Sequence, residues 1–285
     1  MADILVGCCN WTDHPDFYPV HLRPPDRLAY YARYFPLVEV DSTFYHLQSW
    51  STFERWAHVT PPDFAFNVKA FRALTLHERD EAGRVLMPTP ETATRFRDSL
   101  GPLRDAGKLR AVHLQFPPSF TATDAHRDHL HRLRGWFADD LVSIEFRHRS
   151  WLAPETQEAT FALLRALSYV YTIVDEPQGG TNSVPPVVAV TNDRLALFRL
   201  HGRNQATWDK PALKDTGDQY TYRYPADILR ELLAKIHEAG KEAHAVHVLF
   251  NNNVGGYGVR NALELRDLLG QPHPPIEAAT QGTLF

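Results

Sequence analysis

Short apolar stretches rich in β-branched and aromatic residues alternate along the chain with longer stretches whose apolar positions recur at helical spacing. Strands that alternate with helices in this way predict a parallel sheet, and eight of them predict a (β/α)8 TIM-like barrel. The predicted strands are Ile4–Gly7, Leu37–Asp41, Phe64–Lys69, Ala111–Phe116, Val142–Arg147, Tyr169–Asp175, Leu195–His201 and Ala243–Asn251. The predicted helices are 26–35, 50–58, 91–106, 124–134, 155–167, 225–239 and 258–269.

Two segments depart from this alternation. The stretch 176–194 contains Gly179, Gly180, Pro185 and Pro186 and has no helical period, so we expect the sixth helix to be missing. The last residues, QPHPPIEAATQGTLF, are Pro-rich and polar. We therefore expect a single barrel domain over 1–270 and a flexible tail over 271–285.

Polar side chains recur two residues apart at the carboxyl end of six predicted strands. Because alternate residues of a strand share a face, each pair should point the same way, while the apolar residues between them pack beneath helices. The pairs are Glu39 and Asp41, Asn67 and Lys69, His113 and Gln115, Glu145 and Arg147, Arg199 and His201, and the run Asn251–Asn253. Barrel interiors normally hold aliphatic residues, so this pattern predicts a functional site at the carboxyl end of the barrel, its mouth.

These charges have a second interpretation, which is a buried network that only neutralises itself. Glu39 and Glu145 would then balance Lys69, Arg147 and Arg199 without any catalysis. The functional interpretation is favoured because barrel enzymes place their catalytic groups at this face. Two long loops, 70–90 and 201–224, follow strands at the same end. They are expected to contact substrate or to be plain solvated surface.

Composition and charge exclude several classes of function. The net charge is −4, with 30 basic and 34 acidic residues, so contact with nucleic acid would need a local basic patch. Cys8 and Cys9 are adjacent, and neighbours of this kind rarely form an unstrained disulfide. Asp3 and the short apolar run after it do not resemble a signal peptide, and no apolar stretch is long enough to span a membrane. A cytoplasmic location is expected.

Separated motifs of this chain resemble the YecE-like family, a bacterial and archaeal TIM-barrel group classed as domain of unknown function 72. The resemblance covers residues 4–269 and implies the barrel fold, but it implies no established reaction. Its motifs are Phe17-Tyr18-Pro19, Val38-Glu39-Val40-Asp41-Ser42-Thr43-Phe44-Tyr45, Phe64-Ala65-Phe66-Asn67-Val68-Lys69, Gln115-Phe116-Pro117-Pro118-Ser119-Phe120, Glu145-Phe146-Arg147-His148-Arg149-Ser150-Trp151, Arg199-Leu200-His201-Gly202-Arg203 and Phe250-Asn251-Asn252. The chain departs from the family pattern at Gly7-Cys8-Cys9-Asn10, Asp41 and Leu76-His77, where the family usually has Gly-Thr-Ser-Gly, Asn and Thr-His.

The first hypothesis for the mouth is an enzyme that acts on a phosphate- or carboxylate-bearing substrate. Arginine and lysine side chains would hold the anion. Glu145 or Asp175 would serve as the base and His201 as the acid, since crowded charges shift pKa values. The predicted substrate contacts are Glu39, Asp41, Tyr45, Lys69, Gln115, Arg147, Arg199, Arg203, Asn251 and Asn252.

A metal-assisted hydrolase is a narrower form of this hypothesis. Barrels that resemble endonuclease IV cleave DNA with His, Asp and Glu ligands at the mouth, and His113, Glu145, Asp175 and His201 are the candidate ligands of a divalent metal here. The comparison is made at the level of the fold alone. His113 is equally well explained as a hydrogen-bonded histidine of the core.

The last five residues suggest a partner. Gln281-Gly282-Thr283-Leu284-Phe285 is similar to the pentapeptide with which bacterial replication and repair proteins dock on the sliding clamp. Gln281 would form hydrogen bonds, while Leu284 and Phe285 fill an apolar cleft. A clamp-bound barrel would process nucleic acid, because tethering raises the effective concentration. The alternative is an adaptor whose mouth binds a ligand without turning it over.

Overall fold

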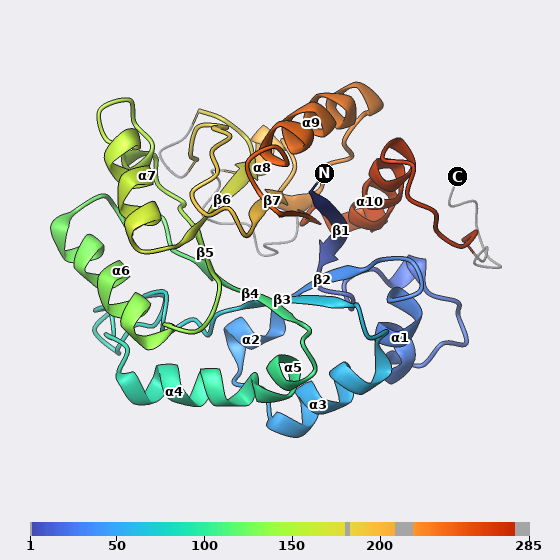
Figure 1. Cartoon of the computed structure of the whole chain (residues 1–285), viewed down its shortest axis with the longest axis horizontal. Coiled ribbons are helices and arrows are strands. Elements are labelled where there is room, and N and C mark those ends of the chain that lie inside the picture. The colour runs from blue at the N-terminus through green and yellow to red at the C-terminus, as the bar shows by residue number, and fades with distance from the viewer. Residues whose placement is uncertain (1, 180–182, 209–218, 277–285) are drawn as a thin grey trace.

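Eight parallel strands close into a barrel in the computed structural model, which describes residues 2–179, 183–208 and 219–276 (Figure 1). The strands are β1 (Asp3–Cys9), β2 (Leu37–Val40), β3 (Ala65–Lys69), β4 (Leu109–Gln115), β5 (Val142–Glu145), β6 (Val170–Asp175), β7 (Ala196–Leu200) and β8 (Ala245–Phe250). Sequence neighbours pair in order, and β8 closes the barrel on β1. The predicted barrel is therefore confirmed.

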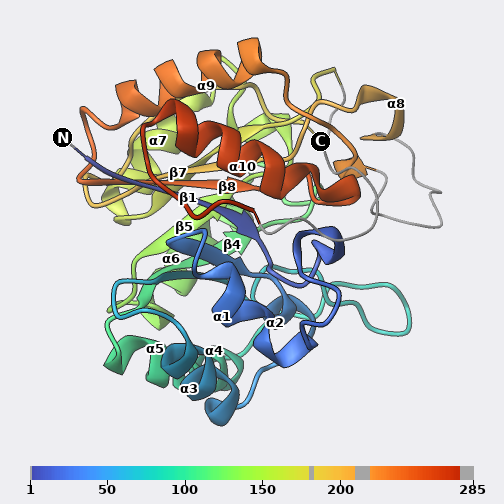
Figure 2. The ribbon, with the colours of Figure 1, turned by 90° about the vertical axis from the view of Figure 1, so that its right-hand side faces the viewer.

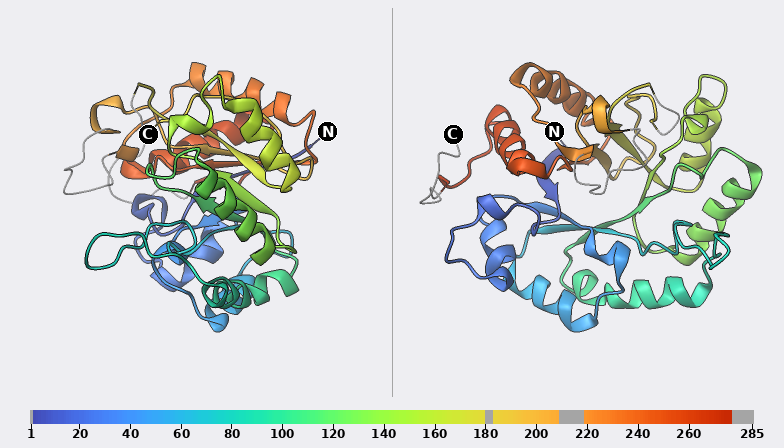
Figure 3. Two further views of the ribbon diagram at one scale, coloured as in Figure 1. Left: turned by 90° about the vertical axis from the view of Figure 1, so that its left-hand side faces the viewer. Right: turned by 180° about the vertical axis from the view of Figure 1, so that it is seen from behind.

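Helices surround the strands on the outside (Figure 1). They are α1 (Arg27–Tyr31), α2 (Ser42–Tyr45), α3 (Trp50–Val59), α4 (Pro90–Ser99), α5 (Gly101–Asp105), α6 (Asp124–Trp136), α7 (Gln157–Ala166), α8 (Gln205–Trp208), α9 (Ala226–Ala239) and α10 (Tyr257–Leu268). In the described part of the segment between β6 and β7 the chain forms no helix, as the glycines and prolines there predicted. Figure 3 shows the same shell of helices from the side and from behind.

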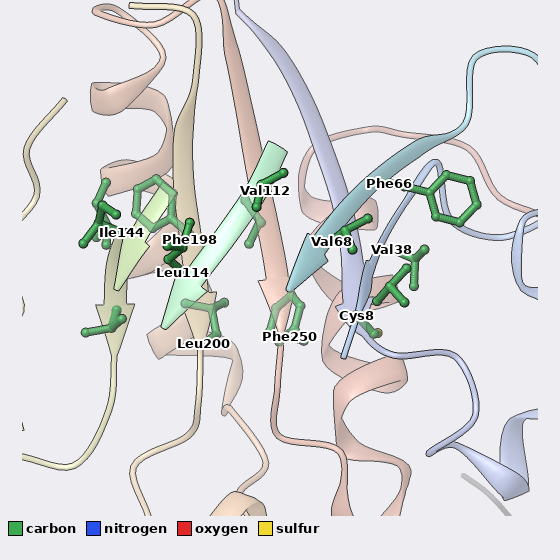
Figure 4. Packing of buried hydrophobic residues seen from close by; sticks show 14 of the residues in the cluster. Cys8, Val38, Phe66, Val68, Val112, Leu114, Ile144, Phe198, Leu200 and Phe250 are labelled. Carbon is green, nitrogen blue, oxygen red and sulfur yellow. The ribbon is translucent and has the colours of Figure 1, made fainter. Parts of the chain in front are cut away.

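The two faces of each strand carry different side chains. Large apolar residues on the outer face pack against the helices (Figure 4), among them Val38, Phe66, Val112, Phe198 and Phe250. A separate apolar layer fills the inside of the barrel toward the amino ends of the strands. It contains Leu37, Ala65, Ala111, Val170, Leu197 and Leu249. The charged groups of the interior therefore lie in its carboxyl half, and the polar residues level with the apolar layer, Thr172 and His247, are uncharged.

The short helices α2 and α8 follow strand ends, and Figure 2 shows α8 at the end of the barrel opposite the N-terminus. At the other end of the sequence, the first part of the predicted tail contacts the barrel. Arg266 donates to the carbonyl of Pro272 (2.8 Å), and Tyr34 donates to the carbonyl of Pro275 (3.2 Å). None of the described helices is long and apolar enough to span a bilayer.

Candidate functional site

Arg199 links opposite sides of the barrel interior. Its Nη1 lies 2.6 Å from Oε2 of Glu145 on β5, and its Nη2 lies 2.6 Å from Oε1 of Glu39 on β2. Neither strand neighbours β7 in the sheet, so these contacts cross the inside of the barrel. The Arg199 side chain is only 1% exposed. The charged residues predicted at the strand ends therefore do meet in one cluster.

Glu145 is the acceptor of several hydrogen bonds in this cluster, in addition to its contact with Arg199. Its Oε1 accepts from Gln115 Nε2 (2.5 Å), His201 Nε2 (3.1 Å) and Arg147 Nη1 (3.4 Å). Burial works to raise the pKa of Glu145, but the Arg199 guanidinium and the imidazoles of His201 and His113 hold that pKa well below its ordinary value. Glu145 is therefore an ionised carboxylate that the surrounding donors hold in place.

The two buried histidines of the mouth are neutral at pH 7. Burial lowers the pKa of His201 to about 4 and also lowers the pKa of His113. His201 Nδ1 is 2.9 Å from Nδ2 of Asn251, and His113 Nδ1 is 2.9 Å from the hydroxyl of Ser143. Both rings thus have partners inside the protein, which fixes their orientation.

Asp41 and Lys69 form the part of the cluster that reaches solvent. Lys69 Nζ lies 3.6 Å from Asp41 Oδ1, and their side chains are 14% and 18% exposed. Lys69 Nζ also lies 4.9 Å from the ring centre of Phe44. Burial, together with the negative charge of Glu39, raises the pKa of Asp41 to about 7, against the opposing effect of Lys69 and Arg199. Asp41 is therefore poised to exchange a proton near neutral pH.

Glu39 completes a pair of carboxyl groups with Asp41. Burial disfavours the ionised form of Glu39, but the Arg199 guanidinium outweighs it and lowers the pKa of Glu39. Within the described structure, Oε2 of Glu39 and Oδ1 of Asp41 are both buried and without a hydrogen-bond partner. A hydrogen bond with Glu39 also favours the protonated form of Asp41 and so contributes to its raised pKa.

A cavity of about 520 Å³ opens above Asp41 and Lys69. Its walls come from the loops after β1, β2, β7 and β8 and from Lys69 at the end of β3, and most of the lining residues have a polar group on the side chain. The other lining residues are Asn10, Asp13, Ser42, Tyr45, His46, Tyr220, Asn251, Asn253 and Val254. Of the predicted substrate contacts, Asp41, Tyr45, Lys69 and Asn251 thus lie on this cavity. A cavity of this size suits a small molecule.

Asp175 and Arg203 lie apart from this cavity. The Asp175 carboxylate accepts two bonds from Arg203 Nε (2.9 and 3.0 Å), one from Arg203 Nη2 (2.6 Å) and one from the Tyr224 hydroxyl (2.8 Å). In the sheet Val174 is level with Arg199, which points inward, so Asp175 points to the outer face. Asn252 is likewise buried, and it donates to the carbonyl of Tyr222 (2.8 Å). These three side chains hold the loop after β7.

The alternation of faces on β6 instead brings Glu176 to the mouth. Glu176 is not among the residues predicted from the sequence. Glu176 Oε2 lies 3.6 Å from Arg147 Nε, and Oε1 accepts from the Val184 amide (2.8 Å). The Arg147 guanidinium also lies 4.6 Å from the ring centre of Trp208. Burial raises the pKa of Glu176 to about 7 although Arg147 opposes it. The signal was the two-residue spacing of Val174 and Glu176.

The predicted metal ligands do not form one group, because Asp175 is on the outer face while the other three meet around Glu145. In the described ranges, the residues whose ligand atoms converge are Cys9, Glu39 and Asp41, within 4.8 Å of one another. Arg199 Nη2 lies among them, 3.5 Å from Cys9 Sγ and 3.9 Å from Asp41 Oδ1. Burial and the charge of Glu39 also raise the pKa of Cys9 well above its ordinary value. A guanidinium and a protonated thiol fit a divalent cation poorly.

The two predicted loops differ in how they meet the site. The loop after β3 forms a projecting hairpin, visible in Figure 2, that is closed by an Asp80–Arg84 ion pair (2.7 Å). The loop after β7 places the rings of Trp208 and Tyr220 each 6.1 Å from the His201 ring. The predicted clamp-binding residues Gln281, Leu284 and Phe285 lie outside the described residues.

Comparison with known proteins places this geometry in a family. The model of the family described as "Protein of unknown function DUF72" matches residues 5–283. The UPF0759 protein YunF of Bacillus subtilis is 35% identical over 271 residues, which cover 93% of this chain and 94% of that protein.

Solved structures agree with the sequence match. A DUF72 family protein from Enterococcus faecalis superimposes with a TM-score of 0.87 at 29% identity, covering 98% of this chain and 100% of the other. A DUF72 family protein from Thermotoga maritima superimposes with a TM-score of 0.82 at 30% identity, covering 94% and 100%. The match therefore extends over nearly the whole barrel.

Proposed function

The chain belongs to the DUF72 family, and we propose that it is an enzyme acting on a small anionic substrate, one that bears a phosphate or a carboxylate. The proposal rests on Asp41 and Lys69, which lie 3.6 Å apart at the floor of the mouth cavity. A cation that anchors an anion beside a carboxyl group that titrates near pH 7 is an arrangement suited to general acid catalysis.

The charge cluster beneath the cavity favours an anion when Asp41 and Glu176 are protonated. Burial raises the pKa values of both Asp41 and Glu176 to about 7, so neither carries a full charge at neutral pH. The remaining charged groups are three cations and two carboxylates, namely Lys69, Arg147, Arg199, Glu39 and Glu145. When Asp41 and Glu176 are both protonated, these five groups carry one excess positive charge, which a phosphate or carboxylate group beside Lys69 neutralises; the exposed Asp13 carboxylate on the cavity wall adds one negative charge.

In this proposal the exposed and the buried groups have different roles. Lys69 holds the anion, and Asp41 donates its proton to the group that leaves or develops negative charge. Glu145 and His201 have no exposed side-chain surface, so they act as positioning residues for the groups above them. Asp175, on the outer face, keeps the loop after β7 in place through Arg203.

Replacing Lys69 with alanine tests the anion site. We expect Lys69→Ala to weaken binding of inorganic phosphate about tenfold or more, because a charge-assisted bond is lost. Isothermal titration calorimetry measures this directly. Lys235, a partly exposed lysine of α9, is the control, and Lys235→Ala should bind phosphate as the unchanged protein does. Equal phosphate affinity in Lys69→Ala and the unchanged protein would rule out the anion site.

Docking on the bacterial sliding clamp is a second proposal, and only the terminal pentapeptide supports it. In this reading the barrel is tethered near DNA and acts on a nucleic-acid phosphate, or it serves as an adaptor without turnover. The net charge of −4 opposes tight binding to free DNA.

Removal of residues 281–285 is expected to abolish binding to the clamp, since both apolar anchors are lost with Leu284 and Phe285. Surface plasmon resonance on an immobilised bacterial clamp gives the measurement. Thr283→Ala, which leaves the Gln and the two apolar anchors intact, is the matched control and should bind normally. If the full chain does not bind, or the shortened chain binds equally well, the clamp is not a partner.

A further inference from the structure

We infer that the anion taken by this cavity carries hydroxyl groups, as a sugar phosphate or a hydroxy acid does. The inference rests on the proposed anion site, and it adds that the rest of the ligand must supply hydrogen-bond donors. It follows from the direction in which the side-chain amides of the cavity wall point. Those directions are fixed by partners that leave no choice of orientation.

The orientation of Asn251 is determined through His201. Glu145 is an ionised carboxylate that can only accept, so the His201 Nε2 that lies 3.1 Å from it carries the proton. In a neutral imidazole the other nitrogen, Nδ1, is then an acceptor. Asn251 must therefore turn its NH2 group toward Nδ1, at 2.9 Å, and present its carbonyl oxygen on the cavity side.

Two further amides of the wall are oriented in the same sense. Asn10 donates Nδ2 to the Asp13 carboxylate (3.1 Å), and its own Oδ1 accepts from the Trp11 amide (3.0 Å). Asn253 donates Nδ2 to the carbonyl of Cys9 (2.9 Å). Each of the three amides thus directs its NH2 group toward a protein acceptor and uses at least one of its two N–H bonds there.

The cavity therefore presents hydrogen-bond acceptors to a ligand, in addition to the cationic donor Lys69. The acceptors are the Asn251 carbonyl oxygen, the Asp41 carboxyl group, and the Asp13 carboxylate, whose Oδ1 already accepts from Asn10 and Thr12. A ligand that fills the cavity without donors would leave the Asn251 oxygen unpaired, which is unfavourable once water is displaced. The ligand must supply hydrogen-bond donors.

Hydroxyl groups meet this requirement better than an ammonium group. Lys69 Nζ and Arg199 Nη2 already lie 3.6 and 3.9 Å from Asp41 Oδ1. A third cation at the cavity floor would be repelled by both. A hydroxyl donates without adding charge, and the rings of Tyr45 and Tyr220 in the wall offer apolar surface to the carbon chain.

Matched ligand pairs test this inference on the unchanged protein. Isothermal titration calorimetry compares glycerol phosphate with propyl phosphate, and glycerate with propionate, so that the phosphate and carboxylate forms are examined separately. We expect the hydroxylated member of at least one pair to bind about tenfold tighter or more, since two hydroxyls add two hydrogen bonds.

The possible results are distinguishable. Equal affinity within each pair, alongside measurable binding of inorganic phosphate, overturns the inference and leaves the anion site standing. No binding of any of these anions overturns the proposed function and the inference together.

A variant of Asn251 tests whether the preference for hydroxylated ligands comes from the cavity wall. Asn251→Leu removes the acceptor, so the hydroxylated and plain phosphates should bind with affinities within about threefold of each other. Asn192→Leu, in the exposed loop before β7, is the control and should keep the full preference. Thermal unfolding of both variants checks that they fold. A folded Asn251→Leu that keeps the full preference contradicts the role given to the Asn251 carbonyl.

Discussion

Replacement of Arg199 with methionine is expected to lower the free energy of unfolding by about 3–5 kcal/mol. Methionine fills much of the same volume, but it removes the guanidinium on β7 that donates to both Glu39 and Glu145. Both carboxylates are fully buried, so each would have to be protonated or hydrated at a cost. Urea unfolding followed by tryptophan fluorescence measures the change.

Two controls separate this loss from a general effect of losing an arginine. Arg84→Met breaks an ion pair whose arginine is 80% exposed, and it should change the free energy of unfolding by less than about 1 kcal/mol. A triple variant, Arg199→Met with Glu39→Gln and Glu145→Gln, removes the stranded charges and should recover part of the loss. A folded Arg199→Met with unchanged stability would show that the network is not what holds the mouth together.

Most of this network could be predicted from the sequence, because the pattern of charged and apolar residues in the strands shows which side chains face the barrel interior. On β2 and β5 a charged residue is flanked by apolar ones, as Glu39 lies between Val38 and Val40, so the two faces are distinguishable. Such a strand can be assigned to inside and outside without a structure. The register of the barrel then brings the inward residues of distant strands together.

On β6 the same reasoning fails. Val170–Val174 is almost uniformly apolar, because a barrel strand is buried on both faces. Without a charged residue inside this stretch, the sequence does not show which residues face inward, and a shift of one residue exchanges the two faces. Asp175 was therefore chosen as a base, whereas the structure turns it outward and places Glu176 beside Arg147.

The contacts between side chains on different strands could also not be predicted from the sequence. Asp41 and Lys69 were both selected, but their contact depends on the register of β2 against β3, in which Glu39 is level with Asn67. The four-residue helix α2, too short for a recognisable period, carries Tyr45 to the cavity. The difference in exposure between Asp41 and the buried Glu145 is likewise set by how the loops cover the mouth.

Replacement of Asp41 with asparagine is expected to lower turnover about 10²–10⁴-fold on any substrate that a screen of phosphate and carboxylate compounds identifies. Asparagine keeps the shape and can still donate a hydrogen bond, but it cannot release a proton. Binding of the substrate should change much less than turnover, because Lys69 is untouched. Asp16→Asn, an exposed aspartate outside the cavity, is the control and should retain full turnover.

The pH profile of the unchanged protein tests the same role with a definite sign. Burial raises the pKa of Asp41 to about 7, so the carboxyl group is protonated below that pH and able to act as an acid. Turnover should therefore be level between about pH 5 and 7 and should fall about tenfold per pH unit above it. The falling limb should be absent from the residual activity of Asp41→Asn. A profile that instead rises through pH 7 would make Asp41 a base, and one in which the variant keeps the limb would assign the proton to another group.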